Sequence, residues 1–138
     1  MGVWCRKSQA AQSAKLEGHH MYQGMLWLDY EAPGNGCNYK ATVSKCLASP
    51  DSVILDFHGK EAGHAFSGSC RLTLVAGSQF SGPGHFLYKG APDVESVVSV
   101  DVDLADRKLF LTGTWHNRGD AELYRLNAEL KRVAPPEH

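Results

Sequence analysis

Apolar and polar side chains alternate along most of the chain, with a period of two residues. Because successive side chains of a β-strand point to opposite faces, this alternation predicts strands with one apolar face. The clearest stretch is 97–116. Pairing Leu104 with Leu109 places Val98 opposite Trp115 and puts both apolar faces on one side, whereas a slip of one residue would expose one face to water. The pattern therefore predicts an antiparallel hairpin in this register.

The segment that follows predicts a third strand beside this hairpin. The residues after His116 are typical of a turn, because Asn and Gly tolerate the positive φ of tight turns. Pairing His116 with Ala121 would place Tyr124 opposite Gly113, where an aromatic ring can cover the gap that a glycine leaves. A helix is the alternative for 121–133, because its leucines also follow a helical spacing. The matching register favours the strand.

A second hairpin with the same device is predicted upstream. A three-residue loop, 77–79, would pair Ala76 with Phe80. This register would place Tyr88 opposite Gly68, again an aromatic side chain over a strand glycine. The pattern indicates that glycines lie where strands bend or where backbones approach closely.

Eight strands joined by short turns, without a convincing interior helix, predict a single all-β domain. The expected architecture is an antiparallel eight-stranded up-and-down β-barrel or a two-sheet sandwich. Inward glycines favour the barrel, because they let a closing sheet coil. The β domain would span 22–133, between an N-terminal extension (1–21) and a tail (134–138). The extension is expected to be disordered, to form a short helix over 10–16, or to be an addition made for expression.

Residues 111–119 read LTGTWHNRG. This segment resembles the L-T-G-x-W-x-N segment that opens avidin-type barrels, and it shares the G-x-W of lipocalin-like barrels. The resemblance implies a small barrel in which Trp115 packs near one end.

Composition excludes several classes of partner. The chain has 138 residues and a formal net charge of -1, with 43% hydrophobic and 21% charged residues. This charge gives no drive toward nucleic acid or an anionic membrane, and no apolar run approaches the roughly 20 residues of a membrane span. The four cysteines lack metal-type spacing, and Cys37 and Cys46 would lie about 30 Å apart on one extended strand. We therefore expect reduced thiols in a cytoplasmic protein.

Four aromatic side chains and one carboxylate are candidates for a ligand site. In the predicted registers the following residues line the barrel interior or mouth: Trp115, Glu122, Tyr124, Tyr39 and Phe86. Inward glycines would leave room beside them for a small apolar or amphipathic molecule. Glu122 would either bind the polar end of that molecule or point into water. The sequence thus favours a non-catalytic binding module, with no cofactor.

A metal site is the weaker chemical candidate. His58, Glu61 and His64 have the spacing H-x-x-E-x-x-H around a predicted loop. Two imidazoles and a carboxylate can hold zinc with an open position. A loop does not force these side chains to converge as a helix would, so solvated polar groups are the simpler interpretation. An enzyme that uses this group or Glu122 ranks well behind a binding module.

A protein-interaction module without a ligand is the main alternative. Large apolar side chains occupy predicted outward positions: Met25, Trp27, Ile54, Leu87 and Phe110. So many of them on a wetted face would indicate an interface. In a homodimer through the outer face, His116, Val97 and Phe110 would lie in the contact.

Overall fold

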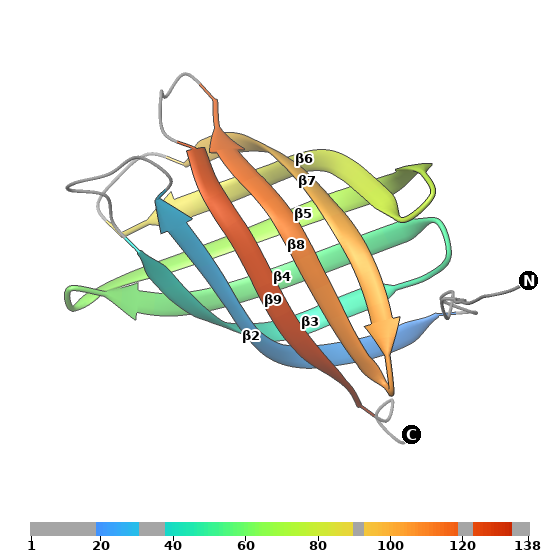
Figure 1. Ribbon diagram of the computed structural model, residues 1–138. Coiled ribbons are helices and arrows are strands. Elements are labelled where there is room, and N and C mark those ends of the chain that lie inside the picture. The colour runs from blue at the N-terminus through green and yellow to red at the C-terminus, as the bar shows by residue number, and fades with distance from the viewer. Residues whose placement is uncertain (1–18, 31–37, 90–92, 119–122, 134–138) are drawn as a thin grey trace, which may run out of the picture.

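The computed structural model describes residues 19–30, 38–89, 93–118 and 123–133, and every regular element among them is a β-strand. The strands are β2 (His20–Tyr30), β3 (Tyr39–Ala48), β4 (Ser52–Glu61), β5 (His64–Ala76), β6 (Gln79–Tyr88), β7 (Val94–Ala105), β8 (Lys108–Asn117) and β9 (Leu123–Val133). Each pairs antiparallel with the next, and β9 pairs with β2, so the sheet closes on itself (Figure 1). The predicted eight-stranded up-and-down barrel is confirmed, and closure excludes the two-sheet sandwich.

The alternation seen in the sequence sorts side chains into an inner and an outer face. In β8, Leu109, Leu111 and Trp115 are buried, whereas Thr112 and Thr114 between them are exposed. Most other strands follow the same rule, but a bulge between Val43 and Lys45 in β3 moves the next buried position to Cys46, and Leu74 near the end of β5 is exposed. The buried side chains form one apolar cluster inside the barrel. Burial of this cluster is the main favourable term that holds the closed sheet together.

The β7–β8 hairpin has the predicted register. Leu104 pairs with Leu109, and Val98 pairs with Trp115. The side chain of Trp115 is completely buried. The segment from Leu123 to Val133 is a strand rather than a helix, as its predicted pairing with β8 favoured.

The exact β8–β9 register was predicted wrongly. His116 pairs with Leu123 rather than with Ala121, and Tyr124 consequently lies opposite Trp115. The shift is two residues. A shift of two leaves every side chain on its predicted face, so the inner and outer faces are unchanged.

The shift is accompanied by a change at Asn117, which the sequence indicated as the first turn residue. Asn117 instead belongs to β8 and pairs with Ser96 of β7. Its side chain points inward and forms hydrogen bonds there. An inward hydrogen-bonded side chain therefore extends the strand beyond the position at which residue preferences place the turn.

The β5–β6 hairpin was also predicted two residues out of register. Phe80 pairs with Leu74 rather than with Ala76, and the ladder is irregular beyond Leu74, so that Ala76 pairs with Gln79. The connection is a two-residue turn in which Gly77 has φ 58°, a conformation that suits glycine. The tight turn and the irregularity together replace the predicted three-residue loop.

This register changes one predicted aromatic–glycine pair. Phe86, rather than Tyr88, lies opposite Gly68. Both aromatic residues remain on inward positions, because the shift is again two residues.

Some strand glycines lie where two backbones approach too closely for a side chain. At Gly113, an added Cβ would collide with backbone atoms of Ser99 and Val100 on β7. Gly24 and Gly82 face neighbouring strands in the same way. These positions confirm the prediction that strand glycines permit close backbone approach.

No helix in the described part of the chain is long and apolar enough to span a membrane.

Candidate ligand-binding site

The inward side chains at one end of the barrel are mainly aromatic. In an up-and-down barrel, the ends of β2, β4, β6 and β8 and the beginnings of β3, β5, β7 and β9 share one end. The inward aromatic residues near this end are Tyr39, Phe66, Phe86, Tyr88, Trp115 and Tyr124. We refer to this part of the molecule as the aromatic end.

Tyr39 lies at the centre of the aromatic end. Its ring centroid is 5.0 Å from that of Phe66, 5.1 Å from that of Phe86, 5.8 Å from that of Tyr124 and 6.4 Å from that of Tyr88. All four contacts are edge-to-face, the geometry that aromatic quadrupoles favour. Tyr39 is only partly buried, so the cluster reaches solvent at this ring.

Trp115 forms the deeper part of the cluster. Its ring packs edge-to-face on Phe57 at 5.5 Å and on Phe86 at 6.5 Å. Its indole Nε1–H donates a hydrogen bond of 2.9 Å to Oδ1 of Asn117. The indole N–H therefore has a hydrogen-bond partner inside the barrel, as buried indoles usually do.

Asn117 and Ser96 form a small polar group next to this indole. The Ser96 hydroxyl donates to the same Oδ1 of Asn117 at 2.8 Å. Both residues are buried: Ser96 is 3% exposed and Asn117 is 8% exposed. They are two of the few buried polar residues in the described part of the chain. Such groups inside an apolar barrel are candidates for orienting a ligand.

A second polar pair lies at the rim of the aromatic end. The Tyr88 hydroxyl donates to Glu61, whose backbone oxygen is 3.1 Å and whose Oε1 is 3.2 Å away. The His64 ring is 5.8 Å from the Tyr88 ring. The rim therefore combines apolar ring surface with a carboxylate and an imidazole.

The structure brings four of the predicted ligand-site residues together. Tyr39, Phe86, Trp115 and Tyr124 are joined by the ring contacts described above, and Trp115 and Tyr124 are paired across β8 and β9. Glu122 lies outside the described residues. Whether these side chains bind a ligand remains a prediction.

The expectation that inward glycines leave empty space was wrong. An added Cβ at Gly68 would collide with the Phe57 ring, and one at Gly59 would collide with the Phe66 ring. At Gly84 the added atom would be 3.0 Å from the Trp115 ring. Aromatic side chains already occupy the volume that these glycines release, so the deep interior is packed at these positions.

The three residues considered for zinc do not form a metal site. His58 is exposed on the outer face of β4, whereas Glu61 and His64 pair at the β4–β5 turn. Within the described ranges, no three His, Cys, Asp or Glu side chains gather so as to hold a metal ion. Residues three apart on one strand, such as His58 and Glu61, point to opposite faces of the sheet. His58 therefore lies away from the other two residues.

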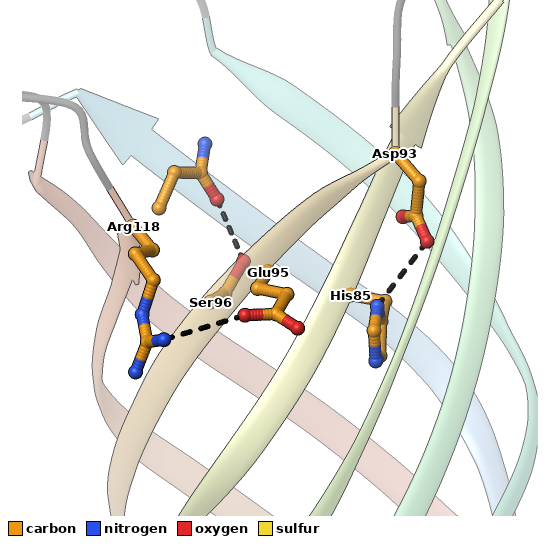
Figure 2. A network of polar contacts seen from close by, with 6 residues as sticks. His85, Asp93, Glu95, Ser96 and Arg118 are labelled. Atoms are coloured by element: carbon orange, nitrogen blue, oxygen red, sulfur yellow. Dashed lines mark hydrogen bonds and ion pairs between the residues drawn. The ribbon is translucent and has the colours of Figure 1, made fainter.

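The outer face near the aromatic end carries exposed ion pairs (Figure 2). Nδ1 of His85 lies 3.3 Å from Asp93, and Arg118 lies 3.4 Å from Glu95. Figure 2 also shows Ser96 next to Glu95 on β7. These side chains are more than half exposed, so their pairs contribute little stability.

Two adjoining hollows also lie outside the barrel, over β4, β5 and β6. Their volumes are about 370 and 520 Å³, and both are lined by His58, Ser67 and Leu87. Their walls mix imidazole, hydroxyl and charged groups with Leu87. Phe66 of the aromatic end also lines the larger hollow, but neither hollow is lined mainly by aromatic rings.

Sequence reasoning missed Asn117 and Ser96 as site residues. Asn117 was interpreted as part of a turn, and Ser96 precedes the stretch in which the alternation is clearest. A usable signal existed, because both residues continue the inward parity of Val98 and Trp115. A polar residue on an inward position needs a partner.

Comparisons with known proteins do not add a function. The sequence matches no protein-family model, and a search of curated proteins gives no significant match. The fold and the side chains therefore define the class, a small antiparallel β-barrel with an aromatic cluster at one end. Because barrels host many unrelated functions, function must be argued from this cluster.

Proposed function

We propose that this small β-barrel is a non-catalytic module that binds a small apolar or amphipathic molecule at its aromatic end. The observation that supports the proposal is the cluster around Tyr39, whose ring contacts four others and is itself partly exposed. Aromatic walls with a few convergent polar groups are typical of ligand sites. The polar groups here are the Asn117–Ser96 pair and the Tyr88–Glu61 pair.

In this proposal the ligand binds at the mouth of the barrel rather than deep in its interior. Phe57, Phe66 and Trp115 fill the space beside the inward glycines, and Trp115 is completely buried. Tyr39 and Tyr88 are the partly buried members of the cluster. A molecule stacked on these two rings would reach the cluster without displacing the packed core.

Fluorescence of Trp115 provides the test. The chain has three tryptophans, so the double variant Trp4→Phe/Trp27→Phe isolates the signal of Trp115. We expect naphthalene derivatives to change this signal saturably. Tyr39→Ala should weaken their binding by about tenfold, the equivalent of losing one favourable aromatic contact. Thr42→Ala, an exposed position on the same strand, is the matched control. Absence of saturable binding for the whole panel would contradict the proposal.

A homodimer through the outer face is the second candidate. Val97 is 50% exposed and Leu123 is 38% exposed. They flank His116 in a cross-strand row over β7, β8 and β9. Exposed aliphatic side chains in such a row are typical of an interaction surface. A second copy of the barrel could cover the row without affecting the aromatic end.

We also propose a cytoplasmic location. Cys46 and Cys70 are both unpaired and buried. Thiols that remain unpaired are the usual state in reducing compartments. Fractionation of the producing cells, with detection of the full chain, tests this location.

A further inference from the structure

We infer that the molecule bound at the aromatic end carries a neutral hydrogen-bond acceptor, a carbonyl or ether oxygen, and that the side-chain NH₂ of Asn117 donates to it. This inference rests on the proposed function and specifies the class of ligand. It is carried by the hydrogen bonds and burial of Asn117, independently of the ring contacts that support binding itself.

The first step is the orientation of the Asn117 amide. An indole nitrogen is only ever a donor, so the atom 2.9 Å from Nε1 of Trp115 must be the amide oxygen. The Ser96 hydroxyl lies 2.8 Å from the same oxygen. The two neighbours therefore fix the amide in one orientation, with its NH₂ group directed away from both.

The second step is the state of that NH₂ group. The two bonds to Oδ1 are the hydrogen bonds that the Asn117 side chain makes in the described part of the chain. Asn117 is nevertheless only 8% exposed. A nearly buried donor without a partner costs free energy, and a ligand oxygen would remove that cost.

The third step concerns charge. The described inward positions at the aromatic end carry aromatic rings, Ser96, Asn117, His64 and Glu61, with no Lys or Arg among them. Glu61 is a carboxylate at the rim. A ligand anion would find no guanidinium or ammonium partner among these described inward side chains and would be repelled by Glu61. A neutral acceptor on an apolar body fits these groups.

Two probes of nearly equal shape test the inference on the full-length protein. Acetylnaphthalene has a carbonyl oxygen where isopropenylnaphthalene has a methylene group. We expect the wild-type protein to bind acetylnaphthalene several-fold to about tenfold more tightly, the effect of one net hydrogen bond. Binding is measured by titration against Trp115 fluorescence.

Substitutions then locate the donor. Asn117→Asp, studied well above the ordinary carboxyl pKa, keeps an acceptor for Trp115 and Ser96 but has no donor, so the preference should disappear. Asn117→Leu, which removes the donor without adding charge, is the second variant. Thr114→Ala, exposed on the same strand and outside the site, is the control and should retain the preference.

The outcomes separate the two proposals. If the wild-type protein binds neither probe, both the proposed function and this inference are wrong. If it binds both probes equally, binding at the aromatic end stands and the acceptor inference is overturned. A preference that persists in Asn117→Asp and Asn117→Leu would also overturn it.

Discussion

Nε1 of Trp115 lies 2.9 Å from Oδ1 of Asn117, two residues further along β8. This bond joins the completely buried indole to a polar residue at the end of the strand. Ser96 of β7 donates to the same oxygen. One amide therefore connects the apolar core, two neighbouring strands and the candidate site, so substitutions at this position affect both stability and binding.

The first prediction concerns the stability supplied by Asn117. Asn117→Leu leaves the buried indole N–H and the Ser96 hydroxyl without their acceptor, and it should lower the free energy of unfolding by about 1–3 kcal/mol. Ser96→Ala removes one of the two bonds and should cost about 1 kcal/mol. Denaturant titration measures both values. Thr114→Ala, exposed on the same strand, is the control and should stay within about 0.5 kcal/mol of wild type. Equal stabilities for Asn117→Leu and the control would contradict the role assigned to the amide.

The second prediction concerns Phe57 and Gly68. The Phe57 ring occupies the volume that a side chain at residue 68 would need. Gly68→Ala should therefore overpack the core and destabilise the protein by about 1–3 kcal/mol. In a Phe57→Leu background the same substitution should cost less, with a coupling free energy of about 0.5–3 kcal/mol from a double-mutant cycle. Additive effects would show that the ring and the glycine do not share this space.

The sequence predicted the sorting of side chains between the two faces well, because a two-residue alternation depends only on strand geometry. The regular ladders of β5–β6 and β8–β9 differ from the predicted registers by two residues. A shift of two changes the cross-strand partner of each residue but keeps its side chain on the predicted face. The registers themselves depend on the turn, where Gly77 adopts positive φ and Asn117 remains in the strand. These details follow from tertiary contacts that the local pattern does not contain.

The candidate site was predicted only in part, because the alternation identifies inward residues but not how their side chains pack. Tyr39, Phe86, Trp115 and Tyr124 are large inward side chains, and closure of the barrel brings them together. The packing of rings into the space beside glycines could not be predicted, because it depends on side-chain directions across neighbouring strands. His58 illustrates the opposite case, in which a suggestive spacing places side chains on different faces.

The third prediction concerns the close approach at Gly113. An added Cβ would meet backbone atoms of Ser99 and Val100, which cannot rotate away as a side chain can. Gly113→Ala should therefore destabilise the barrel by about 1–3 kcal/mol or more. Thr112→Ala, the exposed neighbour, should have an effect of less than about 0.5 kcal/mol. Thermal and denaturant unfolding measure the difference, and a stable Gly113→Ala variant would contradict the backbone contact.

The fourth prediction tests the homodimer candidate. We expect light scattering of the wild-type protein to give twice the 15.1 kDa mass of one chain. Val97→Lys places a charge in the exposed aliphatic row and should dissociate the pair, because a buried unpaired ammonium is costly. Asp101→Lys, exposed on the same strand and outside that row, is the control and should leave the mass unchanged. A wild-type protein that is monomeric at all accessible concentrations would contradict this candidate.

The fifth prediction concerns the alkaline pH dependence of stability. Burial raises the pKa of the Cys46 thiol from 9.0 to about 12, because the apolar interior disfavours the thiolate. The stabilisation linked to this thiol is fully present below pH 9.0, the value for the unfolded chain, and is lost as pH rises toward about 12. In that window the unfolded chain releases a proton that the folded protein retains, so the free energy of unfolding should fall by about 1.4 kcal/mol per pH unit for this group.

Comparison with Cys46→Ala isolates this contribution from the other groups that titrate at high pH. The variant should be less stable near neutrality, because it leaves a small cavity, but its stability should decline less steeply above pH 9.0. Urea unfolding at a series of pH values measures both slopes. A Cys5→Ser/Cys37→Ser background removes the other thiols outside the described residues. Parallel slopes for the two proteins would contradict a buried, protonated Cys46, because only a thiol whose pKa differs between the folded and unfolded states can alter the slope.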